Sequence, residues 1–249
     1  MPIKAVSFDI WDTLLVDDSD EPKRKSAGLL SKSDARVAAI FEVAKKYNSS
    51  ITLPDVQKAY NENFKIFNKL WYESCITQKV PARITDLLNL LNIAVEPAEL
   101  AEITTCWEEM EYTIPPDAVP GAKEALARLS GHYKLGIISD TVVSPGRLLK
   151  EILKKYDMLQ YFSVFTFSDA VGVSKPSPAV FNDFLNQMNL KPHEVVHIGD
   201  RPHNDIDGPK NVGMRALLFD GVEKRALAKH KPDAVFSDYA ELFDLIKRL

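Results

Sequence analysis

Short apolar runs alternate with amphipathic helical patterns through the second half of the sequence, and few folds accommodate this alternation. The predicted strands span residues 135–138, 164–166, 195–198, 216–219 and 234–236. The predicted helices span residues 122–129, 148–156, 178–188, 205–212 and 239–249. Strands and helices in alternation form a parallel sheet that helices cover on both faces. We therefore predict an α/β core.

A further buried strand is predicted near the N-terminus, where the apolar run Ile3–Phe8 stops at Asp9. A carboxylate at the C-terminal end of such a strand lies where open α/β sheets bind their ligands. Asp9 by itself is also interpretable as a turn former or a helix cap, because short motifs often occur by chance. The other strand ends provide the context that favours a functional role.

Residues 17–114 are predicted to form a separate helical subdomain, which we call the cap. Its four amphipathic helices are expected at residues 33–47, 56–71, 84–91 and 97–110. Pro115 and Pro116 then end the helical pattern. The predicted organisation is a discontinuous, Rossmann-like α/β core of residues 1–16 and 115–249, with the four-helix cap inserted after the first strand.

Composition excludes several classes of function. The chain has 249 residues, is 45% hydrophobic and carries a net charge of −4, so no nucleic-acid partner is expected. No apolar run approaches the ~20 residues of a membrane helix, and no leader pattern opens the sequence, so a cytoplasmic protein is expected. Cys75 and Cys106 are predicted to be free thiols, and the charged segment 16–26 a solvated connection. The oligomeric state is left open.

Three of the predicted strands end in residues that can carry chemistry, namely Asp9, Ser139 and Asp200, and Lys175 lies in a loop between the last two. In a parallel sheet these strand ends share one edge. Mg²⁺ binds one or two carboxylates together with phosphate oxygens, and a carboxylate can itself attack phosphorus. The set therefore predicts phosphoryl chemistry on a small phosphorylated molecule. Taken singly, each residue is also typical of a turn or a surface loop.

The same segments carry a family resemblance. Residues 8–14 (FDIWDTL), 135–140 (LGIISD), 173–178 (VSKPSP) and 197–200 (HIGD), with Asn204-Asp205 after the last, resemble the four motifs of the haloacid dehalogenase-like hydrolase superfamily. The resemblance covers the whole α/β portion, and the helical insertion is similar to the cap of that family. Any one motif is a weak signal, whereas the four in this order are a strong one.

The resemblance implies a nucleophile and a metal site. Asp9 would be the nucleophile, and Mg²⁺ would bind Asp9, Asp200 and the backbone carbonyl of Trp11. Asp205 is included in the predicted metal site as a supporting carboxylate. The expected reaction is hydrolysis of a small phosphate monoester through an aspartyl-phosphate intermediate.

The resemblance also implies residues that bind substrate. Ser139 and Lys175 would hold the phosphoryl oxygens, and Lys175 is also predicted to be catalytic because it would hold Asp9 and the incoming anion together. Asp140 and Thr13, which belong to the same motifs, complete the predicted substrate-binding set.

The sequence departs from the family pattern at Trp11. Phosphatases of this family usually have an aspartate there, two residues after the nucleophile, which serves as general acid and base. Tryptophan cannot transfer protons, and the next residue, Asp12, is either a replacement for that acid or a turn residue, the interpretation that the turn preferences of aspartate favour. Asp12 is kept among the predicted catalytic residues.

Two alternatives of different function follow from Trp11. The 2-haloacid dehalogenases of the family also have an aromatic residue there and use their aspartate nucleophile without a metal. Against this, Asp200 and Asp205 resemble the metal-using members, and Asp140 replaces the asparagine typical of dehalogenases. The other alternative is a non-catalytic member that binds a phosphorylated ligand or a partner protein through its cap.

Overall fold

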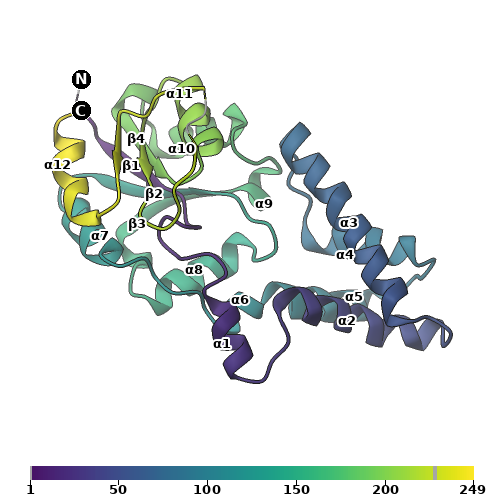
Figure 1. The fold of residues 1–249 in the computed structure, drawn as a ribbon. Helices are drawn as coiled ribbons and strands as arrows, with labels where there is room; N and C mark the ends of the chain where they lie inside the picture. Colours follow the sequence, from purple (N-terminus) through teal and green to yellow (C-terminus); the bar gives the residue numbers. More distant parts are fainter. Residues whose placement is uncertain (1, 227–228) are drawn as a thin grey trace.

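A six-stranded parallel sheet forms the centre of the core (Figure 1). The computed structural model describes residues 2–226 and 229–249. The strands lie in the order β3-β2-β1-β4-β5-β6. They are β1 (Ala5–Phe8), β2 (Lys134–Ser139), β3 (Phe162–Phe167), β4 (Val195–Gly199), β5 (Arg215–Phe219) and β6 (Ala234–Phe236). Every neighbouring pair is parallel, which confirms the predicted fold.

Helices cover both faces of this sheet, as predicted. They are α7 (Ala122–Ser130), α8 (Gly146–Lys155), α9 (Ser168–Val171), α10 (Pro178–Met188), α11 (Gly208–Asn211) and α12 (Leu242–Lys247). On one face, Leu126, Leu149 and Leu242 pack around Phe8 of β1. On the other face, Phe184 and its neighbours of α10 pack against Ala5 and Ile138. The inner strands β1, β2, β4 and β5 are almost entirely buried on both sides, which is why they consist mainly of apolar residues in the sequence.

Short irregular helices account for the differences from the predicted core. Three 3₁₀ turns span Leu159–Tyr161, Pro192–Glu194 and Tyr239–Glu241. The helix predicted at 205–212 begins earlier, as a π-helix over Pro202–Asp207 that leads into α11. The helix predicted at 239–249 is divided between a 3₁₀ turn and α12. Such turns depend on a few local hydrogen bonds, which hydrophobic periodicity does not report.

The cap contains the four predicted helices and two short ones. They are α1 (Asp20–Ser26), α2 (Lys32–Tyr47), α3 (Leu53–Ser74), α4 (Val80–Leu90), α5 (Pro97–Glu108) and α6 (Met110–Thr113). The solvated connection expected at 16–26 is therefore wrong in part, because it contains α1. Acidic residues in the first turn of α1 and basic residues in its last turn complement the helix dipole. The cap lies beside the core, with α1 and α6 at the junction (Figure 1).

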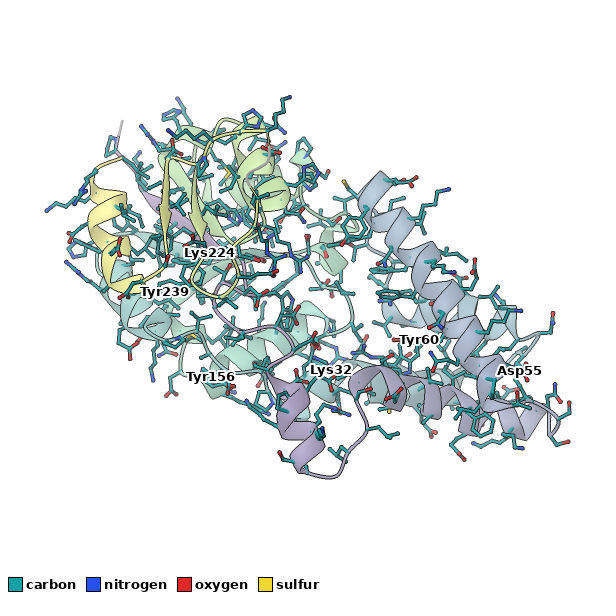
Figure 2. The ribbon with its side chains drawn as sticks, in the orientation of Figure 1. Lys32, Asp55, Tyr60, Tyr156, Lys224 and Tyr239 are labelled. Atoms are coloured by element: carbon teal, nitrogen blue, oxygen red, sulfur yellow. The ribbon has the colours of Figure 1, made fainter. Side chains whose placement is uncertain are left out.

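The cap has its own apolar core. Ile40, Val56, Ile84 and Trp107, one from each long helix, are buried together. Tyr60 of α3 lies edge-on to Trp107, with the ring centres 5.8 Å apart (Figure 2). Along the same helix, Phe67 and Trp71 are also buried. Phe64 is instead 43% exposed and lines the cavity between cap and core.

The two cysteines and the lengths of the helices bear on the expectations from composition. Cys75 at the end of α3 and Cys106 in α5 are both free thiols, as predicted. None of the helices built from the described residues has the length and apolar character required to cross a bilayer. The cellular location of the protein stays a prediction.

The close packing of α10 on β2 predicts the effect of adding one methyl group. A Cβ on Gly136 would lie 2.5 Å from the Phe184 ring and 2.9 Å from the Val164 carbonyl oxygen. We expect Gly136→Ala to lower the free energy of unfolding by about 1–3 kcal/mol, measured by urea denaturation. In the control Gly131→Ala, the nearest atom would be 3.7 Å away, so a change below about 1 kcal/mol is expected. Equal stability of the two variants would contradict this packing.

Candidate active site

Asp9 and Asp200 lie at the point in the sheet where the order of the strands reverses. From β1 the chain adds β2 and β3 on one side, and it then crosses to the other side for β4, β5 and β6. Asp9 directly follows β1 and Asp200 directly follows β4. The Asp9 amide donates a hydrogen bond to the Ile198 carbonyl oxygen at 2.8 Å, which ties the two strand ends together. Open α/β sheets bind their ligands in the crevice at such a reversal.

Asp205 joins these two residues in a buried acidic cluster. Carboxylate oxygens of Asp9, Asp200 and Asp205 all lie within 4.8 Å of one another. The three residues are 4%, 2% and 0% exposed. The π-helix carries Asp205 back over the end of β4, where a Cβ on Gly199 would lie only 2.3 Å from the Asp205 Cγ. Glycine at 199 is therefore what allows this approach.

Lys175 bridges the cluster. Its Nζ lies 2.9 Å from Asp9 Oδ1 and 2.6 Å from Asp205 Oδ1, and the side chain is 1% exposed. Its backbone amide donates to Asp140 Oδ1 at 2.9 Å, which positions the loop. Burial alone would lower the pKa of Lys175, but Asp205, Asp9 and Asp140 raise it above its ordinary value. Lys175 is therefore charged and already bound to the proposed nucleophile.

Both carboxylate oxygens of Asp205 already have hydrogen-bond partners. Its Oδ1 contacts Lys175 Nζ and, at 3.1 Å, His197 Nε2, and its Oδ2 accepts from the Arg201 amide at 2.9 Å. Because burial lowers the pKa of His197, the ring is neutral. A carboxylate only accepts, so Nε2 carries the proton, and the Ser7 hydroxyl donates to Nδ1 at 2.9 Å. Burial would raise the pKa of Asp205, but Lys175 and His197 lower it.

Asp200 shows the opposite pattern. Both of its carboxylate oxygens are buried and have no hydrogen-bond partner among the described residues. The Arg225 Nε lies 3.0 Å from one of them, but without hydrogen-bond geometry. Burial, followed by the charges of Asp205 and Asp9, raises the pKa of Asp200 to about 8. A buried carboxylate with both oxygens free is suited to binding a cation.

A cavity of about 290 Å³ opens from this cluster toward the cap. Residues that line it include Asp9, Lys175 and Arg201 from the core and Lys32, Arg36 and Phe64 from the cap. The half-buried Trp11 and the buried Asp140 line it as well. The Asn204 amide donates to Asp140 Oδ2 at 3.1 Å, and burial raises the pKa of Asp140 to about 6. The cavity is large enough for a small phosphorylated molecule.

Five predicted site residues lie outside the cavity lining, namely Asp200 and Asp205 of the acidic cluster together with Ser139, Thr13 and Asp12. Ser139 is buried, and its hydroxyl has one long contact, 3.5 Å to the Asp140 carbonyl oxygen. Thr13 is buried, and its hydroxyl has no partner among the described residues. Asp12 has a left-handed backbone with φ of 49°, and its side chain accepts from the Asp17 amide at 3.0 Å. Asp12 thus occupies the turn that the alternative interpretation favoured, and its catalytic role stays a prediction.

The sequence interpretation missed several cations at the site. Arg225, from the loop after β5, pairs with Asp12 Oδ2 and Asp200 Oδ2, each at 3.0 Å. Arg201 and Arg36 line the cavity. Of these three arginines, Arg201 alone had a local indication of a role at the site, because it directly follows Asp200 in the sequence. Arg36 has the spacing of an ordinary helix residue, and Arg225 is more than two hundred residues from Asp12.

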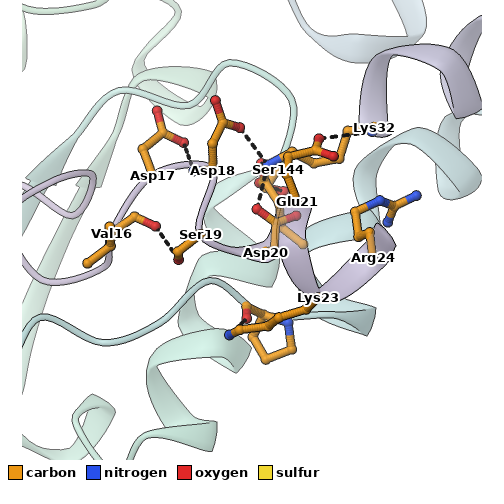
Figure 3. A network of polar contacts seen from close by, with 12 residues as sticks. Val16, Asp17, Asp18, Ser19, Asp20, Glu21, Lys23, Arg24, Lys32 and Ser144 are labelled. Atoms are coloured by element: carbon orange, nitrogen blue, oxygen red, sulfur yellow. Dashed lines mark hydrogen bonds and ion pairs between the residues drawn. The ribbon is translucent and has the colours of Figure 1, made fainter. Parts of the chain in front are cut away.

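A buried ion network at the junction of cap and core was also missed (Figure 3). The Lys32 Nζ, at the start of α2, lies 3.0 Å from Asp18 Oδ1, 2.8 Å from Asp20 Oδ1 and 3.1 Å from Glu111 Oε1. The Ser144 hydroxyl, on the core loop after β2, donates to Glu111. Burial would lower the pKa of Lys32, but the carboxylates raise it. The network joins residues near both points at which the chain passes between core and cap. Lys32, Asp18 and Glu111 of this network also line the cavity.

Comparison with known proteins agrees with this geometry. A 2-haloacid dehalogenase from Pseudomonas syringae superposes with a TM-score of 0.69 at 21% identity, over 99% of each chain. A HAD phosphatase from Thermococcus onnurineus gives 0.64 at 21% identity, over 98% of each chain. The glyceraldehyde 3-phosphate phosphatase of Pyrococcus furiosus is 31% identical, over 99% of this chain and 94% of that one. The family model described as haloacid dehalogenase-like hydrolase matches residues 3–213, and the chain belongs to this family of hydrolases.

Proposed function

We propose that the protein hydrolyses a small phosphate monoester with Mg²⁺, through an aspartyl-phosphate on Asp9. The observation that carries this proposal is the buried cluster of Asp9, Asp200 and Asp205 with Lys175 bound between two of its members. The cluster opens on a cavity of a size that suits a small ligand. Metal-assisted attack by a carboxylate accounts for this concentration of buried acids.

The unpartnered oxygens of Asp200 fit a divalent cation. Asp9 and Asp200 would hold it, with the backbone carbonyl of Trp11 as the third protein ligand. Asp205 would act behind them, because Lys175, His197 and the Arg201 amide already occupy its oxygens. When bound, Mg²⁺ supplies charge neutralisation between Asp9 and the phosphoryl oxygens.

Each step of the proposed reaction is assigned to particular residues of the chain. Asp9 attacks phosphorus, and the ester bond to the leaving oxygen breaks. Lys175, fixed by Asp205, keeps the Asp9 carboxylate and the anionic phosphoryl group together. Water then hydrolyses the aspartyl-phosphate and releases inorganic phosphate. Ser139, with the backbone amides near it, and Thr13 are proposed to contact the phosphoryl oxygens when substrate is bound.

The names of the relatives suggest the substrate to test first. The 31% identical relative is a glyceraldehyde 3-phosphate phosphatase, and we propose a phosphorylated molecule of about that size for this chain. The cavity of about 290 Å³ agrees in size, and Phe64, Arg36 and Lys32 of the cap line it opposite the acidic cluster. A 2-haloacid dehalogenase activity is the second candidate, which Trp11 favours and the acidic cluster disfavours.

The metal proposal predicts a loss of activity on chelation. We expect EDTA to abolish turnover of p-nitrophenyl phosphate and Mg²⁺ to restore it. Asp200→Asn should raise the Mg²⁺ concentration for half-maximal rate by at least about tenfold, because it removes one ligand charge. Asp220→Asn is the matched control, since Asp220 follows β5 as Asp200 follows β4 but pairs with Ser237. Turnover that resists EDTA would refute the metal proposal.

A substrate screen separates the candidate functions. We expect the Mg²⁺-loaded protein to release phosphate from glyceraldehyde 3-phosphate, and Asp9→Asn to release none, because the amide is not a nucleophile. Chloride release from 2-chloropropionate without phosphate release would establish a dehalogenase instead. Binding of vanadate with neither activity, across a broad set of esters, would identify a non-catalytic binding protein.

Trp11 predicts a dependence on the leaving group. Without an acid at this position, an aryl phosphate should turn over faster than an alkyl phosphate, because the phenolate departs without a proton. Asp12→Asn should leave the ratio of the two kcat/KM values unchanged if Asp12 is a turn residue. If Asp12 is the replacement acid, the alkyl rate alone should fall by about 10²–10⁴-fold. Equal rates on both esters in the wild type would contradict the missing acid.

A further inference from the structure

Arg201 is a cavity residue that the proposed mechanism leaves without a role. It follows Asp200 directly, lines the cavity and is partly buried. Among residues 2–226 and 229–249, no carboxylate lies within ion-pair distance of its guanidinium, whereas Arg225 pairs with Asp12, Asp200 and Glu223. An arginine guanidinium stays protonated in proteins. It is therefore a fixed positive charge beside the nucleophile with no acid of its own.

The side chain of Arg201 extends toward the cap. Its Cζ lies 5.9 Å from the ring centre of Trp71 in α3. In an in-line displacement the attacking and leaving oxygens lie on opposite sides of phosphorus. Asp9 attacks from the end of the sheet, so the leaving oxygen faces the cap. The guanidinium of Arg201 is placed on that side.

The other positive groups that line the cavity are already bound to carboxylates or belong to the cap. Lys175 is held by Asp9 and Asp205, and Lys32 is held by three carboxylates of the junction. Trp11 cannot transfer a proton. Arg36 lies within the cap, close enough to Arg83 to contribute to lowering its pKa. Arg201 is thus the cation next to the reaction centre that has the freedom to bind a departing oxygen.

We infer that the Arg201 guanidinium hydrogen-bonds to the leaving-group oxygen and stabilises the charge that develops there. This inference rests on the proposed phosphatase function. Asp9 forms the new bond to phosphorus, the ester P–O bond breaks, and its electron pair stays on the leaving oxygen. That oxygen takes a proton from water, while Arg201 stays protonated throughout. A positioned donor at a developing oxyanion is worth about 10²–10³-fold in rate.

The test compares two leaving groups in Arg201→Met, which keeps an unbranched apolar stem against Trp71. We expect kcat/KM to fall by about 10²-fold on glyceraldehyde 3-phosphate, an alkyl ester, and by less than about 10-fold on p-nitrophenyl phosphate, whose leaving group is already stable as an anion. Arg201→Lys keeps the charge and should recover part of the alkyl rate. If Arg201→Met does not fold, as judged by circular dichroism, the Lys variant still gives the comparison.

Arg128→Met is the matched control. The Arg128 guanidinium lies 4.0 Å from the ring centre of Phe243 in the core, outside the cavity, so both rates should stay at the wild-type level. Equal losses on the two esters in the Arg201 variants would assign the guanidinium to the phosphoryl group and overturn the inference. Unchanged kcat/KM on both esters would show that Arg201 only packs on Trp71 and would also overturn the inference. An inactive wild type would refute the proposed function itself, before any variant is compared.

Discussion

The buried ammonium of Lys175 is the interaction on which the site depends. Three carboxylates within 4.8 Å of one another, all buried, repel one another and are costly to desolvate. Lys175 offsets this by contacting Asp9 and Asp205 at once. Asp205 is in turn held by His197 and by the Arg201 amide. Asp200 contacts the Arg225 Nε at 3.0 Å, but neither of its oxygens has a hydrogen-bond partner among the described residues. The proposed cation would bind at this carboxylate.

Core and cap contribute different parts of the site. The core supplies Asp9 and Asp200 directly after the buried strands β1 and β4, Asp205 from the π-helix and Lys175 from the loop after α9, and the rigid sheet gives these groups precise positions. The cap contributes the opposite wall of the cavity through α2 and α3, and its approach is set by the ion network around Lys32 (Figure 2). The proposed chemistry therefore lies at the sheet edge, and we propose that the cap selects among substrates. The unpaired Arg201 lies between the two.

Much of the fold was predictable because strands that are buried on both faces consist mainly of apolar residues. All six strands and the four long cap helices were predicted from periodicity. Helix ends were less accurate. The helix predicted at 56–71 extends over Leu53–Ser74 as α3, and the 16–26 segment contains α1 instead of a plain connection. Capping and short helices depend on single hydrogen bonds and charge placement, which leave little pattern in the sequence.

The sequence alone determined the α/β core, the cap and the acids that meet at the sheet edge, because parallel topology forces strand ends together whatever lies between them. Only the tertiary structure decided which atoms are paired and which are free. Asp12 accepts from the Asp17 amide, whereas neither oxygen of Asp200 has a hydrogen-bond partner among the described residues. The partners of Asp12 and Lys32 come from segments up to 213 residues away. Such pairing follows from where distant loops pack, and no local spacing encodes it.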